Sequence, residues 1–213
     1  PKKQNQIFAT SYFSGLLKVD GSDITLFNDL NTGPNGLESL STTTNKDIRI
    51  NSPAFDKEGN LWMTNVSTSG GFKAIKKLRA DGQWQSYSVQ DVLSDTFGRY
   101  GPMAIDKNST KWIPTLNEGL LAFNENYSNK FIVINSTTGN LPDNDVRCVA
   151  IDNRNQLWIG TYAGLRVLPS VDRFISETEL TSNAIIIQEG DLAQELFYQQ
   201  TILDIAVDGA NRK

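Results

Sequence analysis

The sequence predicts an all-β protein with a β-propeller fold, in about four blades of four antiparallel strands each. One observation behind this prediction is an Asp-to-Trp motif that recurs along the chain at intervals of 46 to 56 residues. The other is that the stretches between its copies consist of short strand-like runs and turns, with almost no amphipathic helical pattern. Repeats of this length that hold several short strands are typical of propeller blades.

Three complete copies of the motif define the repeat. In each copy an Asp opens a short polar turn, and a Trp follows six positions later on the next predicted strand. The pairs are Asp56 and Trp62, Asp106 and Trp112, and Asp152 and Trp158. A fourth copy begins at Asp208, and Phe8 takes the Trp position of a partial copy near the start. We expect the Asp to accept hydrogen bonds from turn amides, and the Trp to fill the space between neighbouring sheets.

Each repeat is predicted to contain four strands. The first is an apolar run, as in residues 146–152 and 203–208, and the second carries the Trp. The third begins at a Gly-Leu pair, and the fourth is more polar. These later strands are predicted at 119–124 and 164–169 for the third, and at 84–89, 131–135 and 174–179 for the fourth.

Two segments depart from the strand pattern. A single helical turn is predicted at 191–197, where Asp191 is a suitable cap and Leu192 and Leu196 share a face. It lies in the longest interval between motif copies, so we interpret it as an insertion carried by one blade. Residues 28–47 contain Gly, Pro, Ser and Thr and are predicted to form a long exposed connection.

The repeat organises the whole chain as one propeller fragment, 1–213. Both ends fall inside a repeat, so we expect the chain to be a fragment and its blades to be an arc of a larger ring, of about seven blades. The predicted divisions are a partial blade at 1–47, blades at 48–96, 97–144 and 145–201, and the start of a further blade at 202–213.

Composition excludes several functional classes. A net charge of −4 and a pI near 4.9 argue against a nucleic-acid-binding module. The absence of histidine excludes His-containing catalytic triads and His-ligated zinc sites. Cys148 is the single cysteine, so no internal disulfide or cysteine cluster forms, and we expect this residue in the core. No apolar stretch approaches the roughly 20 residues that span a bilayer. The sequence therefore predicts a non-enzymatic protein without metal or cofactor.

One basic cluster is a candidate ligand-binding site. Lys73, Lys77 and Arg79 alternate along a predicted strand and share one face, and Trp84 follows closely. Such a face suits an anionic glycan or a lipid phosphate. The alternative is a solvated outer strand whose charges discourage edge pairing.

The repeated aromatic and acidic residues also have two interpretations. The Trp side chains suit stacking on sugar rings, but their fixed place in the repeat favours packing between blades. The Asp side chains resemble calcium ligands, but their spacing does not fit an EF-hand loop, which favours turn capping. We therefore assign structural roles to Asp56, Trp62, Asp106, Trp112, Asp152, Trp158 and Asp208.

The third copy resembles a known repeat. Residues 146–152, the run Gln156-Leu157-Trp158-Ile159-Gly160-Thr161 and Gly164-Leu165 are similar to the two-component-regulator propeller repeat common in Bacteroidetes. The other copies depart from it, with Met63-Thr64 and Ile113-Pro114 in place of Ile-Gly, and Phe8 in place of Trp. The resemblance implies a propeller fold.

Residues 194–199 and 202–213 also resemble the PorZ family, surface components of the type IX secretion system. This resemblance implies an exported protein of the cell surface or periplasm that acts as a non-enzymatic binding or scaffold propeller. Implied partners are anionic lipopolysaccharide or another glycan, secretion-system proteins, and further blades of the same chain. The alternative is the periplasmic ligand-sensing propeller of a hybrid two-component system that binds oligosaccharide.

Overall fold

The computed structural model describes residues 1–3, 5–11, 13–40, 47–66, 73–94 and 98–213. In these ranges the regular structure is almost entirely β-strand, and no helix is long and apolar enough to cross a membrane. The chain forms two compact units, Pro1–Tyr100 and Gly101–Lys213.

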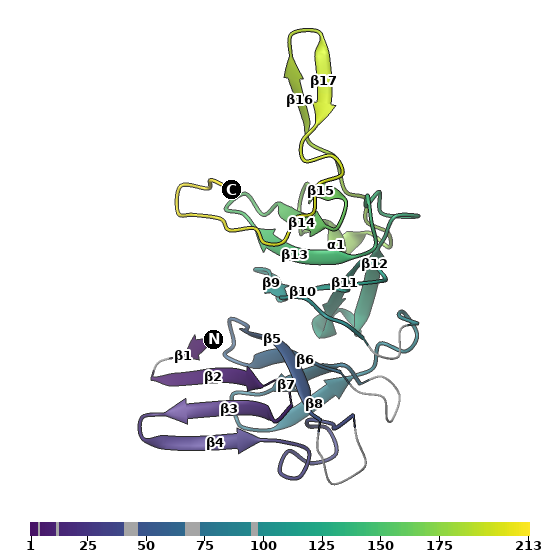
Figure 1. The fold of residues 1–213 in the computed structure, drawn as a ribbon. Coiled ribbons are helices and arrows are strands. Elements are labelled where there is room, and N and C mark those ends of the chain that lie inside the picture. The colour runs from purple at the N-terminus through teal and green to yellow at the C-terminus, as the bar shows by residue number, and fades with distance from the viewer. Residues whose placement is uncertain (4, 12, 41–46, 67–72, 95–97) are drawn as a thin grey trace. The chain divides into compact units, whose positions relative to one another are not determined.

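The first unit contains two four-stranded antiparallel sheets (Figure 1). In each sheet every strand pairs with the strand that follows it in the sequence, which is the topology of a propeller blade. The first sheet consists of β1 (Lys2–Lys3), β2 (Gln6–Ser11), β3 (Gly15–Asp20) and β4 (Asp23–Phe27). The second consists of β5 (Arg49–Phe55), β6 (Leu61–Val66), β7 (Ile75–Leu78) and β8 (Trp84–Tyr87).

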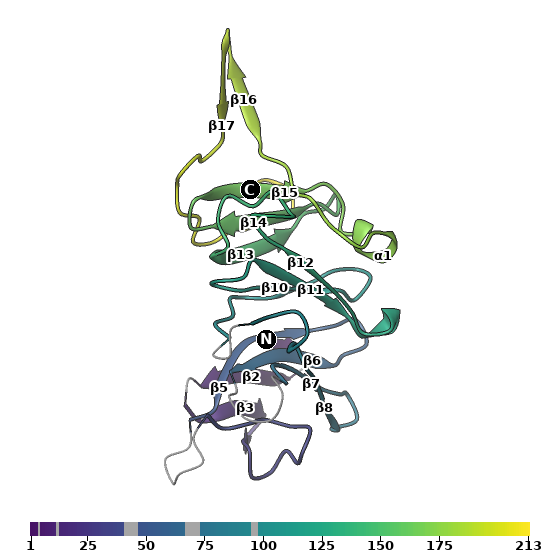
Figure 2. The same ribbon diagram turned by 90° about the vertical axis from the view of Figure 1, so that its right-hand side faces the viewer.

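The second unit contains a four-stranded sheet, a three-stranded sheet and a projecting hairpin (Figures 1 and 2). The four-stranded sheet has β9 (Ala104–Ile105), β10 (Lys111–Pro114), β11 (Leu120–Asn124) and β12 (Lys130–Ile134), with the 3-10 turn η1 (Glu125–Tyr127) before β12. The three-stranded sheet has β13 (Val146–Ile151), β14 (Leu157–Thr161) and β15 (Gly164–Leu168). Helix α1 (Arg173–Ser176) and the hairpin strands β16 (Ile186–Glu189) and β17 (Leu192–Glu195) follow.

The Asp106 carboxylate joins a turn to the indole on the next strand. Its Oδ1 accepts the backbone N–H groups of Asn108 (2.8 Å) and Thr110 (2.9 Å). Its Oδ2 accepts the indole N–H of Trp112 at 3.0 Å. The six-residue spacing thus places one carboxylate between the turn amides and a buried indole, which gives both sets of donors an acceptor.

The other copies use the same geometry. The indole nitrogens of Trp62 and Trp158 lie 2.8 and 3.1 Å from Oδ2 of Asp56 and Asp152. Asp208 opens an equivalent turn, in which its carboxylate accepts two backbone N–H groups at 2.9 and 2.8 Å. The hydrogen bonds to the turn agree with the sequence-based expectation, whereas the bond to the indole is a new feature of the structure.

The aromatic position of one sheet packs against the following sheet. Phe8 in β2 lies edge to face on Phe55 of β5, with ring centroids 5.6 Å apart. Trp112 in β10 is fully buried and lies edge to face on Phe174, 6.1 Å away, in a core that includes β13–β15 residues. We call each such contact layer a seam. Aromatic area buried in the seams is a large source of stability for stacked sheets.

The predicted fourth strand at 174–179 is wrong, because α1 occupies its start. Phe174 is fully buried against Trp112, and the Lys130 ammonium donates to the carbonyl oxygens of Phe174 (2.5 Å) and Glu177 (2.7 Å). A short helix lets Phe174 fill the seam, and the lysine satisfies the carbonyl groups that the helix end leaves free.

The predicted helix at 191–197 is also wrong. Residues of this segment form β17, which pairs with β16 across a tight turn at Gly190, where φ is +61°. Glycine adopts this left-handed conformation without steric cost, and an isolated Gly-Asp pair between strand-like runs is a hairpin signal. The segment therefore pairs as a hairpin strand instead of forming a helical turn.

The predicted strand at 203–208 does not form, although its start is positioned like a first strand. The Ile202 N–H donates to the Thr161 carbonyl at 3.0 Å, as the Val146 N–H donates to the Thr115 carbonyl at 2.9 Å. Both donors stand six residues before an Asp of the repeat. Within residues 98–213 no strand pairs with this segment, so its extended backbone lacks a sheet.

The connection at 28–47 is not exposed throughout, contrary to the prediction; residues 41–46 lie outside the described ranges. Leu37 is buried in the core of the first unit. The buried Asn65 amide accepts the Glu38 N–H at 2.6 Å and donates to the Glu38 carbonyl at 3.1 Å. The fully buried Lys76 ammonium lies 3.2 Å from the Glu38 carboxylate. These contacts fix the connection to the second sheet.

Removing an indole should destabilise the second unit more at Trp112 than at Trp158. Trp112→Ala is expected to lower the free energy of unfolding by about 3–5 kcal/mol, because it leaves a cavity in a closed seam. Trp158→Ala should cost less, because the Trp158 indole is half-buried. Urea denaturation followed by circular dichroism measures both; equal losses would contradict the seam interpretation.

The buried Lys76 ammonium should depend on the Glu38 carboxylate as its counter-charge. Burial lowers the pKa of Lys76, and Glu38 opposes that shift. Glu38→Ala should destabilise the first unit by about 3 kcal/mol, because it leaves a buried ammonium without its counter-charge. The double variant Glu38→Ala/Lys76→Met should recover most of the loss in the same denaturation assay. A double variant no more stable than Glu38→Ala would refute this account.

Candidate functional site

The structure divides the predicted basic cluster over two faces of the β5–β8 sheet. In the strand register Lys77 pairs with Trp62, whereas Leu78 pairs with Trp84. Because neighbouring strand residues point to opposite faces, Lys77 and Trp84 lie on opposite sides of the sheet. The Lys77 ammonium lies 4.8 Å from the Trp62 ring centroid, so it covers the seam indole.

The remaining cluster residues also have local contacts. Arg79 forms an ion pair of 3.0 Å with Asp81 just after β7. Trp84 lies edge to face on Phe27, with centroids 5.8 Å apart, and packs against the core. Lys73 precedes β7 and is half-buried. The four residues are therefore not gathered in one site, and their ligand-binding role stays a prediction.

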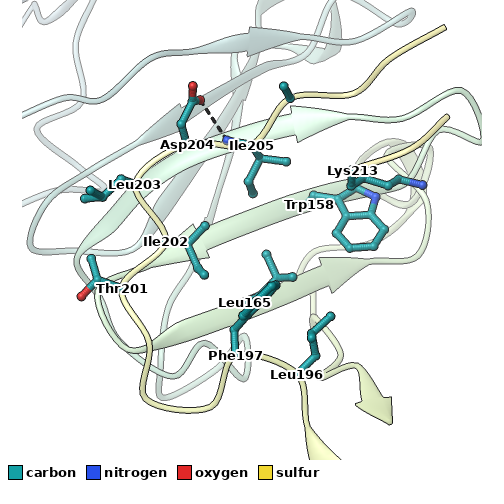
Figure 3. A pocket seen from close by; sticks show the side chains of 11 residues that line it. Trp158, Leu165, Leu196, Phe197, Thr201, Ile202, Leu203, Asp204, Ile205 and Lys213 are labelled. Carbon is teal, nitrogen blue, oxygen red and sulfur yellow. Dashed lines mark hydrogen bonds between the residues drawn. The ribbon is translucent and has the colours of Figure 1, made fainter. Parts of the chain in front are cut away.

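One candidate site is an apolar cleft of about 690 Å³ beside β14 and β15 (Figure 3). The β-strands contribute the Trp158 indole and Leu165, and residues 201–206 form the opposite side. In Figure 3 the side chains of Ile202 and Ile205 lie beside these strand residues. The remaining lining residues are Leu196, Phe197, Thr201, Leu203, Asp204, Ala206 and Lys213.

The cleft arises because the Trp158 seam is incompletely covered. Phe8 and Trp112 pack against a following sheet, whereas the part of the chain that the structure describes places residues 184–185 and 201–206, which belong to no strand, beside Trp158. Phe197 and Leu203 are 49% and 73% exposed at its edge. Sequence reasoning missed this site, since its signal, an apolar run in the longest repeat interval, was interpreted as a strand.

Lys213 provides a positive charge at one end of the cleft, whose lining also includes Asp204. The Lys213 ammonium lies 2.8 Å from the Asp152 carboxylate and 4.7 Å from the Trp158 ring centroid. Burial disfavours the Asp152 anion, but hydrogen bonds from Lys213, the turn amides and Trp158 outweigh it and hold the pKa of Asp152 well below its usual range. The result is a neutralised ion pair over an indole face.

Cys148 beside the cleft is poorly suited to nucleophilic chemistry. It is buried, and its Sγ lies 3.7 Å from the Ile202 carbonyl oxygen. Burial, with a contribution from Asp204, raises the pKa of the thiol to about 11. The thiolate, which is the reactive form, is therefore scarce at neutral pH.

The site chemistry suits contact with apolar surface. Among the described residues no group of three or more Cys, Asp or Glu side chains is placed to hold a metal ion. The carboxylates nearest the indoles are occupied by turn amides. What the cleft offers is exposed aliphatic and aromatic area, with one indole and one ammonium at its end.

Two repeat aspartates should respond to acid in opposite directions. Burial raises the pKa of Asp106, whereas the pKa of Asp152 is lowered. Asp152 therefore stabilises the fold above its unfolded pKa of about 3.9, and this is lost as pH falls further. Asp106 contributes stability that is present below about pH 3.9 and lost as pH rises through its raised folded pKa.

The corresponding variants test these signs in one unit. Asp152→Asn should flatten the acid loss of unfolding free energy, and Asp106→Asn should make that loss steeper. Urea denaturation at a series of pH values from neutral to about 3 measures both slopes. Identical slopes in the two variants would contradict the assignment.

Comparison with known proteins agrees with this architecture. Residues 140–163 match the two component regulator propeller family, as the sequence predicts. The chain matches none of the curated proteins by sequence. In fold it is similar to PorZ, an essential bacterial surface component of the type-IX secretion system of Porphyromonas gingivalis, with a TM-score of 0.79 and 20% identity. That match covers 97% of this chain and 29% of PorZ.

Two extracellular domains from B. thetaiotaomicron are also similar. The domain of a hybrid two component system matches with a TM-score of 0.57, 19% identity and coverage of 79% of this chain and 20% of its own. The domain of a one component system matches with a TM-score of 0.65, 15% identity and coverage of 97% and 24%. The chain thus has the β-propeller fold, spans less than a third of these solved chains, and carries a two component regulator propeller repeat at residues 140–163.

Proposed function

We propose that this chain is part of a non-enzymatic binding or scaffold propeller, similar to PorZ, in an exported protein that acts in type IX secretion. The observation that carries the proposal is the fold similarity to PorZ, which extends over 97% of the chain with a TM-score of 0.79. Residues 194–199 and 202–213, on which the sequence resemblance depends, support the same assignment. The protein then works at the cell surface or in the periplasm.

The roles of the polar side chains support a non-enzymatic protein. The repeat carboxylates of Asp56, Asp106 and Asp152 accept hydrogen bonds from turns and indoles, which gives each a structural role. The Cys148 thiol is buried and protonated at neutral pH. Catalysis needs a nucleophile or a general base near a substrate-sized cleft, and the 690 Å³ cleft is lined mainly by aliphatic and aromatic groups.

An anionic lipopolysaccharide would have to bind through a local group of cations, because the chain carries a net charge of −4. Besides Lys77, which lies over the Trp62 indole, the cations of the predicted cluster are Lys73 and Arg79. The Trp158 cleft, in contrast, suits apolar protein surface, such as a further blade of the same chain or a secretion partner.

The alternative is a periplasmic sensor propeller that binds oligosaccharide. The extracellular sensor domains share the fold, but with TM-scores of 0.57 and 0.65, below the 0.79 of PorZ. This difference favours the secretion role.

Binding to purified anionic lipopolysaccharide tests the proposal. The chain should bind vesicles that contain it, and added salt should weaken binding because the contacts are ionic. Lys73→Ala/Arg79→Ala should reduce affinity about tenfold, since charge-assisted contacts to an anion are among the stronger ones. Lys57→Ala, at an exposed turn lysine outside the cluster, is the matched control. Co-sedimentation with the vesicles measures all three proteins.

Three outcomes would count against the proposal. Equal affinity for neutral oligosaccharide would favour the sensor alternative. An unchanged affinity in Lys73→Ala/Arg79→Ala would remove the cluster from the site. New reducing ends in a polysaccharide panel would refute the non-enzymatic assignment.

A further inference from the structure

The first sheet carries a smaller aromatic residue where the other sheets carry an indole. Phe8 pairs with Lys18 in the strand register, as Trp62 pairs with Lys77, so the two residues hold the same place in their sheets. Position 2, six residues earlier, is Lys rather than Asp. A phenyl ring has no N–H and needs no such acceptor, but it also fills less of the seam.

A cavity of about 200 Å³ lies beside Phe8 in this seam. We call it the Phe8 cavity. Both sheets of the first unit contribute apolar walls, and the buried members are Phe8, Leu61 and Leu78. Among the described residues the lining consists of Gln6, Phe8, Lys18, Phe27, Phe55, Gly59, Leu61, Leu78, Arg79, Ala80 and Gly82. In the second unit the corresponding seam is closed by the fully buried rings of Trp112 and Phe174.

The size and walls of the cavity suit an aromatic ring. An engineered cavity of about 150 Å³ lined by Leu, Ile and Phe binds benzene, so 200 Å³ accommodates one ring with a small substituent. Phe27 and Phe55 already form edge-to-face contacts with Trp84 and Phe8, at 5.8 and 5.6 Å. A bound ring gains the same kind of contact.

Two cations favour an acidic substituent on that ring. The Lys18 and Arg79 side chains are 26% and 42% exposed, so they mark the open side of the cavity, whereas Phe8, Leu61 and Leu78 are buried. Each cation has one carboxylate neighbour, Asp20 at 3.1 Å or Asp81 at 3.0 Å. A ligand carboxylate would therefore share these cations with Asp20 and Asp81, and the cavity would prefer an anionic ligand to a neutral one. Burial of the ligand ring would supply most of the binding free energy.

A sugar fits this chemistry less well. The side-chain amide of Gln6 is committed to Asp20 at 2.8 Å, and the other uncharged side chains of the lining are aromatic or aliphatic. Sugar hydroxyls placed there would lose their hydrogen bonds to water without replacement. We propose that the Phe8 cavity binds a small aromatic carboxylic acid, whose ring takes the space that an indole fills in the Trp112 seam.

Ligand-observed ¹⁹F NMR with 4-fluorobenzoate tests this proposal on the full chain. Binding should be weak, in the range of about 0.1–1 mM, as expected for a ligand of about ten heavy atoms. Phe8→Trp should weaken it at least tenfold, because the added indole fills the cavity. Its melting temperature should be unchanged or higher, so the loss will not reflect unfolding. Phe13→Trp, the same substitution at a phenylalanine 55% exposed, should bind as the parent does.

Two further ligands distinguish the contribution of the aromatic ring to binding from that of the carboxylate charge. Fluorobenzene should bind more weakly than 4-fluorobenzoate, and Lys18→Met should reduce only the binding of the acid. Glucuronate, an acidic sugar, should not compete. If Phe8→Trp lowers the melting temperature, Leu78→Phe narrows the same cavity and replaces it in the assay.

The proposal is overturned if the parent chain binds neither fluorinated probe, or if the folded filler variant binds 4-fluorobenzoate as tightly as the parent. Competition by glucuronate, or equal effects of Lys18→Met on both probes, would overturn the assignment to an aromatic acid. None of these measurements involves lipopolysaccharide, so the result is independent of the proposed function.

Discussion

The hydrogen bond between an aspartate carboxylate and the indole six residues later is the interaction on which the repeat depends. One carboxylate oxygen closes the turn, and the other accepts the N–H of a side chain that would be costly to bury without an acceptor. The pair is therefore a unit. Where the chain has Lys at position 2 instead of Asp, the seam residue is Phe8, which needs no acceptor. This correlation within a single chain explains the motif better than turn capping or packing alone.

The same interaction sets the electrostatics of the seams. Deep burial around Trp112 raises the pKa of Asp106, whereas Lys213 and the turn amides lower that of Asp152 beside the incompletely covered Trp158. Asp106 is thus held by neutral donors, whereas Asp152 also has a cation as a partner. The ammonium that covers Trp158, like Lys77 over Trp62, protects part of an indole face that water would otherwise contact.

The repeat pattern was sufficient to predict the fold, because the Asp-to-Trp spacing fixes the turn, the second strand and the buried position together. Prediction failed where contacts between residues distant in sequence determine the local structure or the burial of a residue. Phe174 forms a helical turn because the Trp112 seam needs a ring there, and Leu37 is buried through the anchoring of Glu38 by Asn65 and Lys76. The face of Trp84 could not be predicted for a related reason: alternation describes one strand, but the face of Trp84 depends on its register with Leu78 on the neighbouring strand. The clefts follow from which seams are filled, and local sequence does not carry that information.

The features that distinguish one sheet of this chain from another therefore lie at positions where the repeat departs from its pattern. Thr115 and Thr161 stand where Asn65 stands in the second sheet, and their hydroxyls bond within the local turn, whereas Asn65 reaches back to Glu38. A cavity lies beside Phe8, where a larger aromatic residue would fill the seam. After the bridge between Val167 and Asn183, the chain forms the β16–β17 hairpin instead of a fourth strand of the β13–β15 sheet. The turns at Asp56, Asp106, Asp152 and Asp208 keep their hydrogen bonds despite these changes. A scaffold held by many equivalent turns tolerates a local loss of packing, and this tolerance is what allows a seam to become a binding site.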